Sequence, residues 1–298
     1  MIRVRVPATS ANMGAGFDTL GIAFNLYSRL EIEETDRGLE IITVNNSGNV
    51  QSDKTNLVYR AMDCVFRQVG YKPGGLRIRQ DSAIPMTRGL GSSSACIIGG
   101  MLAANALSGR MLAYSEIMDL AAGMEGHPDN AAPALYGGFC VSVSENGRIF
   151  VKSTKLRNDL KFAVMIPDFF VATRKSRGAL PEFVSLRDAA FNISRASLFQ
   201  AALVTGDYEF LRYGAEDRLH QPYRKSYIDG FDGIFEETYR LGSKATYLSG
   251  SGPTIVSILT GSGERFKRGM ESFFSENSHQ WRCMLLECDN VGSVLSEI

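Results

Sequence analysis

The sequence is poor in the residues that build metal centres and disulfide frameworks. It contains only three histidines, which argues against a histidine-rich metal cluster. The cysteines are odd in number and scattered, and none forms a Cys-x-x-Cys pair; they are Cys64, Cys96, Cys140, Cys283 and Cys288. This pattern favours reduced thiols in a cytoplasmic protein over disulfides or a zinc site.

An excess of charge and a long apolar run are also lacking. Lys plus Arg and Asp plus Glu both number 32, and no basic stripe occurs, which argues against nucleic-acid partners and membrane surfaces. No apolar segment approaches the length of a membrane span. The first residues, "MIRVRVPATS", alternate like a strand and lack the apolar core of a signal peptide. We therefore expect a cytoplasmic globular protein.

Strand and helix patterns are mixed in both halves of the 298-residue chain, which predicts an α+β protein. We assign residues 1–155 and 156–298 to two domains. In the first domain we predict strands at 2–8, 27–34, 39–44, 74–82 and 137–144, and helices at 56–70, 92–107 and 115–125. In the second we predict strands at 161–168, 245–259 (two strands with a tight turn) and 281–288, and helices at 185–205, 207–219, 230–242 and 263–276.

A glycine-rich loop, "PMTRGLGSSSA" (85–95), joins one of these strands to a helix. The helix, residues 92–107, is apolar almost all round and should be buried, and its central Gly99 and Gly100 suggest close approach of another backbone. Free N–H groups and the dipole at such a helix start form an anion site. The lysine of the common ATPase loop is absent, but a metal ion and the helix start can supply the positive charge. A tight turn before a capped, buried helix is the alternative interpretation.

The wider sequence resembles the GHMP kinases. The loop matches their second signature, Pro-x-x-x-Gly-Leu-Gly-Ser-Ser, at each fixed position from Pro85 to Ser93. The first signature is similar to "VPATSANMGAGFDTLGIAFNLY" (6–27), and the third to "YLSGSGPTIVSIL" (247–259). The first block lacks the basic residue and the Gly-Glu-His-like run of sugar and mevalonate kinases. Together with "EGHPDNAAPALYGGF" (125–139), this favours the homoserine kinase branch, although Met13 and Ala15 depart from its usual leucine and proline.

The resemblance implies a two-domain GHMP kinase fold. Its N-terminal domain would be similar to that of ribosomal proteins and would bind ATP, and its C-terminal domain would be ferredoxin-like. It implies ATP and Mg²⁺ as cofactors and phosphorylation of the side-chain hydroxyl of L-homoserine, a step of threonine biosynthesis. Homodimers are common in the family, but the sequence itself identifies no interface.

The resemblance also implies which residues hold the nucleotide and the metal. The ATP-binding residues would be Pro85, Arg88, Gly89, Leu90, Gly91, Ser92, Ser93, Ser94 and Ala95. By family position, Asn56 and Leu57 are candidates for the adenine pocket. Ser92 or Ser93, together with Glu125, would supply the oxygen ligands that Mg²⁺ prefers. An exposed helix end is the alternative for Glu125, although an acid there meets an unfavourable dipole.

Homoserine is a zwitterion with a hydroxyl at its far end, so its site needs a cation, oxygen acceptors and a group that aims the hydroxyl. By resemblance, Arg177 and Arg224 would contact substrate, and arginine binds a carboxylate with two parallel hydrogen bonds. Further substrate contacts implied by the family motifs are Asn12, Asp18, His127 and Gly250. A cap for Asp18 and an Asx turn for Asn12 are alternatives that can hold at the same time.

Two residues carry the expectation about the chemical step. By resemblance, Asn130 lies beside the substrate hydroxyl, where an amide orients the hydroxyl but cannot accept its proton. The γ-phosphate would then take the proton, as a loose transition state allows. Asp129 is the alternative: a carboxylate that reaches the hydroxyl would act as a general base.

Three other functions remain open from the sequence. The chain could be another GHMP member, such as a mevalonate kinase or a diphosphomevalonate decarboxylase. It could be a non-catalytic regulator on the kinase fold, although the loop serines, Glu125 and the arginines argue against this. A nucleic-acid-binding use of the N-terminal fold is disfavoured by the zero net charge.

Overall fold

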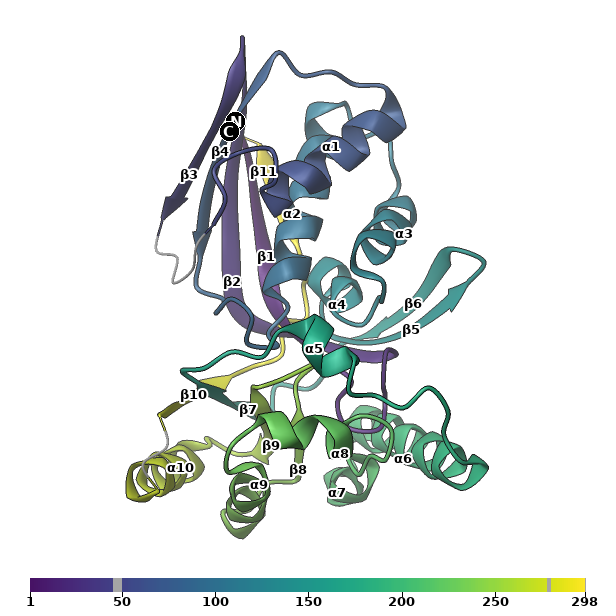
Figure 1. Ribbon diagram of the computed structural model, residues 1–298, viewed down its shortest axis with the longest axis vertical. Helices are drawn as coiled ribbons and strands as arrows, with labels where there is room; N and C mark the ends of the chain where they lie inside the picture. The colour runs from purple at the N-terminus through teal and green to yellow at the C-terminus, as the bar shows by residue number, and fades with distance from the viewer. Residues whose placement is uncertain (45–49, 278–279, 298) are drawn as a thin grey trace.

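The computed structural model describes residues 1–44, 50–277 and 280–297. In these ranges the strands form two sheets, and Figure 1 shows them one above the other along the long axis of the molecule. Helices accompany both sheets, so the α+β prediction is confirmed. No helix in the described ranges has both the length and the apolar composition to cross a membrane.

The larger sheet has seven strands in the order β11-β1-β2-β4-β3, and β5 and β6 extend it from β2. Among the strands of the described residues, only β3 and β4 pair in parallel. The long strand β2 pairs with β5 near its start and with β4 through its second half, so it bends the sheet toward the centre of the molecule. The strands are β1 (Ile2–Ala11), β2 (Leu20–Thr35), β3 (Gly38–Val44), β4 (Gly75–Ser82), β5 (Phe139–Glu145), β6 (Arg148–Thr154) and β11 (Val294–Glu297).

The helices of this part lie on one face of the larger sheet (Figure 1). They are α1 (Leu57–Val69), α2 (Ser92–Leu107), α3 (Tyr114–Glu125) and α4 (Ala131–Tyr136). Helix α2 is buried along most of its length, as predicted. A Cβ added at Gly100 would lie 2.6 Å from the carbonyl oxygen of Val58 in α1, so only glycine permits this packing distance. The close approach of another backbone is therefore confirmed at Gly100, whereas Gly99 faces the side chains of Leu30 and Val6.

The smaller sheet has the strand order β10-β7-β9-β8. Its strands are β7 (Leu160–Pro167), β8 (Ala245–Leu248), β9 (Ile255–Thr260) and β10 (Trp281–Leu286). The longer helices of this part are α6 (Leu186–Thr205), α9 (Phe231–Arg240) and α10 (Glu264–Glu276). The short ones are α5 (Thr173–Arg177), η1 (Tyr208–Phe210), α7 (Leu211–Gly214), α8 (Gln221–Arg224) and η2 (Lys225–Tyr227).

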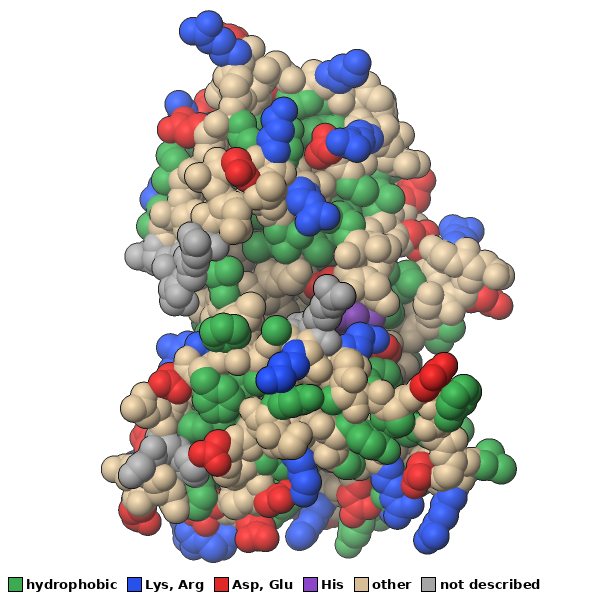
Figure 2. Space-filling model, viewed as in Figure 1, with side chains coloured by type: hydrophobic (Ala, Val, Ile, Leu, Met, Phe, Trp, Pro, Cys, Tyr) green, Lys and Arg blue, Asp and Glu red, His purple; other side chains and the backbone are tan. Residues whose placement is uncertain are grey.

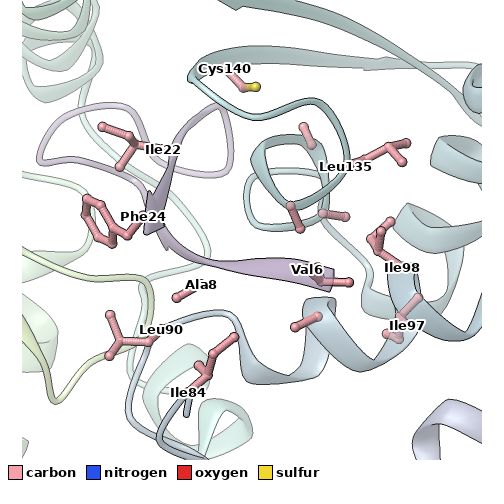
Figure 3. Close-up of a cluster of buried hydrophobic side chains, with 14 of the residues drawn as sticks. Val6, Ala8, Ile22, Phe24, Ile84, Leu90, Ile97, Ile98, Leu135 and Cys140 are labelled. Atoms are coloured by element: carbon pink, nitrogen blue, oxygen red, sulfur yellow. The ribbon is translucent and has the colours of Figure 1, made fainter. Parts of the chain in front are cut away.

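One continuous hydrophobic core joins the two sheets. The rings of Phe24 in β2 and Phe162 in β7 are both fully buried, and their centroids are 5.1 Å apart. Leu90 and Ile84, which precede α2, belong to the same core, and Figure 3 shows both side chains below Ala8. Leu90 therefore anchors the glycine loop in the core, which fixes the loop relative to both sheets.

The helix predicted over residues 207–219 is confirmed only in its first half. The structure has η1 and α7, and the helical conformation stops at Ala215. The backbone of Ala215 packs against Gly14, where a Cβ would overlap it. The Asp217 carboxylate then accepts hydrogen bonds from the N–H groups of Leu219, His220 and Gln221. The Asp217 side chain thus caps the following turn, and the chain does not continue as the helix that apolar spacing predicts up to residue 219.

Some elements were not predicted: β6, β11, α4, α5, α8 and η2. Strand β11 affects the organisation most, because it leaves the smaller sheet and pairs with β1 in the larger one. The proposed division at residue 155 stays a prediction.

Candidate active site

A cavity of about 480 Å³ lies where the two parts of the molecule meet, and Figure 2 shows the surface hollowed there. Most of the predicted site residues line it. They are Asn12, Asp18, Asn56, Leu57, Arg88, Gly89, Leu90, Gly91, Ser92, Ser93, Ser94, Glu125, His127, Asp129, Asn130, Arg177, Arg224 and Gly250. Pro85 and Ala95 are not among the lining residues and belong to the loop and helix behind the wall.

The glycine loop forms one end of the cavity. Gly91 is the residue before α2, with φ of 66°, and it has no side chain to cap the first N–H groups of the helix. A Cβ at this position would overlap the hydroxyl oxygen of Thr9. The Thr9 backbone N–H donates to the Leu90 carbonyl at 3.1 Å, which ties the loop to β1. The helix start is thus open on the side where an anion would bind.

Glu125 ends α3 beside this helix start. Its Oε2 accepts a hydrogen bond of 2.6 Å from the Ser94 hydroxyl. Burial raises the pKa of Glu125 and outweighs the hydrogen bonds from Ser94 and Ser93. No cluster of three or more His, Cys, Asp or Glu residues that could hold a metal occurs in the described ranges. One carboxylate with serine hydroxyls suits Mg²⁺, which uses few protein oxygens and takes its other ligands from phosphates and water.

The loop between α3 and α4 supplies three polar side chains that are joined by hydrogen bonds. The Asp129 Oδ1 accepts from His127 Nδ1 at 2.5 Å and from Asn130 Nδ2 at 3.3 Å. The Asn130 Oδ1 accepts from the Thr9 hydroxyl at 2.8 Å, which fixes the orientation of its amide. Burial alone lowers the pKa of His127, but the hydrogen bond and charge of Asp129 outweigh it and leave that pKa raised.

A bidentate ion pair closes the other end of the cavity. Arg177, at the end of α5, donates to both carboxylate oxygens of Asp18 at 2.8 and 3.0 Å. Asp18 follows β1, so this pair connects the two parts of the molecule across the cavity.

Arg224 lies close to both members of that ion pair. Its Nη1 and the Asn12 Nδ2 both donate to the Gly250 carbonyl at 2.9 Å. The Arg224 side chain is almost completely buried, and burial, with the nearby charge of Arg177, lowers its pKa to about 10. Asn12 Oδ1 also accepts from the Asp18 N–H at 3.0 Å. Donor and acceptor are six residues apart, so this bond is not the two-residue Asx turn expected as an alternative for Asn12.

Two predicted nucleotide residues have structural partners of their own. Asn56 caps α1 by accepting from the N–H groups of Val58 and Tyr59, and its amide donates to the Gln51 carbonyl at 2.8 Å. Arg88 donates to the carbonyls of Pro167 and Asp168, which ties the glycine loop to the end of β7. Burial lowers the pKa of Arg88.

Sequence reasoning missed Thr9 and Gln80. Gln80 lines the cavity wall and donates to Asn56 Oδ1 at 3.1 Å. It shares a buried strand face with Leu76 and Ile78, and a polar residue on the apolar face of an alternating strand was the available signal. Thr9 lies inside the first signature block, but nothing in one sequence distinguishes its hydroxyl from that of Ser10.

Comparison with known proteins decides the family. Residues 56–138 match the GHMP kinases N terminal domain, and residues 199–276 match the GHMP kinases C terminal domain. A homoserine kinase from Caldicellulosiruptor saccharolyticus is 45% identical over 300 residues, covering 100% of this chain and 97% of the relative. The chain belongs to the homoserine kinases of the GHMP kinase family. This GHMP kinase is therefore a phosphotransferase of an ATP-using family, and the predicted enzyme class is confirmed.

Solved structures agree with this assignment. The crystal structure of a homoserine kinase from Cytophaga hutchinsonii has a TM-score of 0.89 and 26% identity to this GHMP kinase, and covers 99% of this chain and 97% of its own. The predicted two-domain family fold is thereby confirmed. A complex described with MVAPP, AMPPCP and magnesium has a TM-score of 0.75 and 16% identity, covers 100% of this chain and 99% of its own, and shows the fold alone.

Proposed function

We propose that this protein transfers the γ-phosphoryl group of ATP to the side-chain hydroxyl of L-homoserine, giving O-phospho-L-homoserine for threonine biosynthesis in the cytoplasm. One observation carries the proposal. A single cavity is lined both by an open helix start in a glycine loop and by two arginines with an opposing aspartate. In-line phosphoryl transfer requires donor and acceptor to be held side by side in this way.

The phosphate end would hold ATP through backbone groups. The first N–H groups of α2 and the helix dipole would bind the phosphates, and Gly89 and Gly91 would let them approach the backbone. Ser92 or Ser93, together with Glu125, would hold Mg²⁺, whose charge neutralises the phosphate oxygens when it is bound. The raised pKa of Glu125 supports this role, because a buried carboxylate without a cation partner gains most from one.

The acceptor end would hold both charges of the amino acid. Arg224 and Arg177 would bind the carboxylate, while Asp18 and Asn12 supply oxygens to the ammonium group and the hydroxyl. The cluster suits a zwitterion because its two guanidinium groups oppose one carboxylate at the same place. His127 would add a further polar contact, and Gly250 would contact the substrate through its backbone.

The chemical step would proceed without a protein base. Asn130 would orient the hydroxyl, and the proton would pass to a γ-phosphate oxygen as the transfer proceeds. The bonds of Asp129 support a holding role, since its Oδ1 accepts from both His127 and Asn130. Asp129 would thereby set the orientation of these two neighbours.

Phosphorylation of L-homoserine by ATP is the decisive experiment. ADP release would be followed with L-homoserine, mevalonate and galactose, and the product identified by phosphorus NMR, in the wild type and in Arg224→Ala. We expect turnover with L-homoserine and strong impairment in the variant. Turnover with mevalonate alone would reassign the chain to another branch of the family. Nucleotide binding without turnover on any alcohol would support a non-catalytic regulator.

Two expectations rest on the family resemblance. We propose that residues 1–155 and 156–298 form the two domains, with β11 returning to the first. We also propose a homodimer, which sedimentation velocity would measure directly.

A further inference from the structure

His220 lies behind the acceptor end of the cavity and does not line it. It immediately precedes α8, and its side chain is completely buried. The ring stacks on Phe17 with centroids 5.5 Å apart. The guanidinium carbons of Arg177 and Arg224 lie 5.6 and 5.4 Å from the centroid of the same Phe17 ring. His220 is therefore built into the support of the two arginines.

The hydrogen bonds of His220 define where its proton lies. Its Nε2 is 2.8 Å from the Gly14 carbonyl oxygen, which can only accept, so Nε2 carries a hydrogen and donates it. Its Nδ1 is 3.2 Å from Arg224 Nη1, which can only donate, so Nδ1 is unprotonated and accepts. Both bonds form together only in the neutral ring with its proton on Nε2.

Burial of the ring favours the same neutral state, against the pull of the nearby carboxylates. Burial lowers the pKa of His220; Arg224 lowers it further, whereas Asp217 and, more weakly, Asp18 raise it. The Asp217 carboxylate lies 3.5 Å from Nε2, farther than the Gly14 carbonyl. That carboxylate already accepts from backbone N–H groups and from Asn192.

We propose that neutral His220 is a positioning residue for the acceptor substrate: its Nδ1 holds the Arg224 guanidinium, and its Nε2–H fastens that arginine to the loop after β1. This rests on the proposed function, which gives Arg224 the carboxylate of homoserine. A guanidinium fixed through Nη1 by His220 and the Gly250 carbonyl keeps one orientation toward the cavity. Its buried Nε has no partner among the described residues, so the proper orientation depends on these Nη1 bonds.

Two substitutions test the two hydrogen bonds of the His220 ring one at a time. The amide of His220→Asn places an oxygen near the position of Nδ1 and keeps an acceptor for Arg224. The amide of His220→Gln reaches the position of Nε2 and keeps only the donor to Gly14. We expect the KM for L-homoserine to rise roughly tenfold or more in His220→Gln, the usual effect of losing a hydrogen bond to a charged group. In His220→Asn the rise should be several times smaller, and the KM for ATP should stay unchanged in both.

The matched control is a variant that loses buried hydrogen bonds near His220 but none to Arg224. Asn192→Ala loses its bonds to the Ala15 carbonyl, to Asp217 and to the Arg218 N–H. It should lower the melting temperature as the His220 variants do, but leave the KM for L-homoserine unchanged. Equal KM values for the two His220 variants, or a rise in Asn192→Ala as large as in His220→Gln, would overturn the proposal.

Nitrogen NMR tests the inference without substrate. The chain has three histidines, so the His220 ring is assigned by its loss in His220→Gln. At pH 7 we expect a neutral ring protonated on Nε2; a charged ring or an Nδ1 proton would contradict the inference. If wild type shows this tautomer but does not phosphorylate L-homoserine, the proposed function fails by itself. If it phosphorylates L-homoserine with the other tautomer, only the role of His220 fails.

Discussion

The two ends of the cavity are made from different parts of the polypeptide. The phosphate end is mainly backbone from one continuous stretch, with Gly91 opening α2. The acceptor end is made of charged side chains from segments far apart, since Asp18 and Arg177 are 159 residues from each other in the chain. The first end should therefore be sensitive to added volume and tolerant of changed charge, and the second should show the reverse.

The largest expected effect comes from adding one methyl group at the phosphate end. Gly91→Ala would push a Cβ into the Thr9 hydroxyl and displace the loop, so phosphoryl transfer should fall by more than roughly a hundredfold. Gly109→Ala is the matched control, because Gly109 also has positive φ but nothing within 4 Å of an added Cβ. Both variants carry the same kind of backbone strain. Equal losses in ATP-dependent turnover would mean that strain, rather than the blocked loop, explains the effect.

At the acceptor end, the corresponding change removes charge. Arg224→Ala should raise the KM for L-homoserine roughly a hundredfold, since losing a buried charged partner costs about 2–5 kcal/mol. The KM for ATP should hardly change. Arg218→Ala deletes a more exposed guanidinium that pairs with Asp188 at 3.1 Å, and should leave both KM values unaltered. Steady-state kinetics with each substrate varied in turn would measure both KM values. A similar rise in the KM for ATP would contradict the assignment of Arg224 to the acceptor end alone.

Glu125 is an exception to this comparison, because it is a charged side chain at the phosphate end, which is otherwise built mainly of backbone. Glu125→Gln should lower turnover by roughly 10- to 100-fold, the usual range when the surroundings of a bound metal are disturbed. Burial raises the pKa of Glu125, so in the wild type Mg²⁺ affinity should fall with decreasing pH already above the ordinary glutamate range. The variant should lack this pH dependence.

The same substitution should stabilise the protein in the absence of nucleotide and metal. A carboxyl whose pKa is raised on folding destabilises the folded state at neutral pH. This cost starts to decrease as pH falls through the folded pKa and is gone below the unfolded pKa. Glu125→Gln should therefore melt higher than wild type at pH 7, by calorimetry, with the difference vanishing in acid. A variant that melts lower at pH 7 would show that the carboxylate is already well compensated.

Asp129 stands between the two ends and should give a smaller loss. Asp129→Asn keeps an oxygen for His127 and Asn130, so turnover should fall by less than the roughly hundredfold that a general base ordinarily contributes. Single-turnover measurements at saturating substrates isolate the chemical step. Complete loss with binding and Mg²⁺ retained would restore the base mechanism.

The smallest effect on catalysis is expected in the cavity wall. Asn56→Ala removes the cap of α1 and should reduce the free energy of unfolding by about 1 kcal/mol. Its KM for ATP should change only a few-fold if Asn56 acts mainly by shaping the wall. Asn56→Asp retains the acceptor for the helix N–H groups and should recover most of the stability in urea unfolding. A large rise in the KM for ATP with normal stability would instead identify a direct contact.

The phosphate end comes from one continuous stretch and the acceptor end from distant segments, and this difference explains which parts of the site the sequence predicts. The glycine loop was recognisable because its chemistry is local: strand, turn and helix start follow one another within Pro85–Ser94. Arg177 and Arg224 were indicated only by family resemblance, because no spacing rule brings together side chains that tertiary packing assembles. Thr9 was missed for the same reason, since its partner Asn130 is 121 residues away.

Errors in the fold also trace to long-range contacts. The apolar spacing over residues 207–219 predicts a helix, but packing of Ala215 against Gly14 and the Asp217 cap end it after Gly214. Strand β11 is only four residues long, and its pairing with β1 is set by neighbours that local pattern cannot reveal.

The return of β11 also has a consequence for biosynthesis. Ile2 pairs with Glu297 and Arg5 with Val294, so one edge of β1 has no strand beside it until residues 294–297 have been translated. Throughout elongation that edge remains available to other chains. A ribosome stalled before residue 294 would therefore hold a nascent protein whose glycine loop is already made but whose strand β1 still has an unpaired edge that other chains can bind.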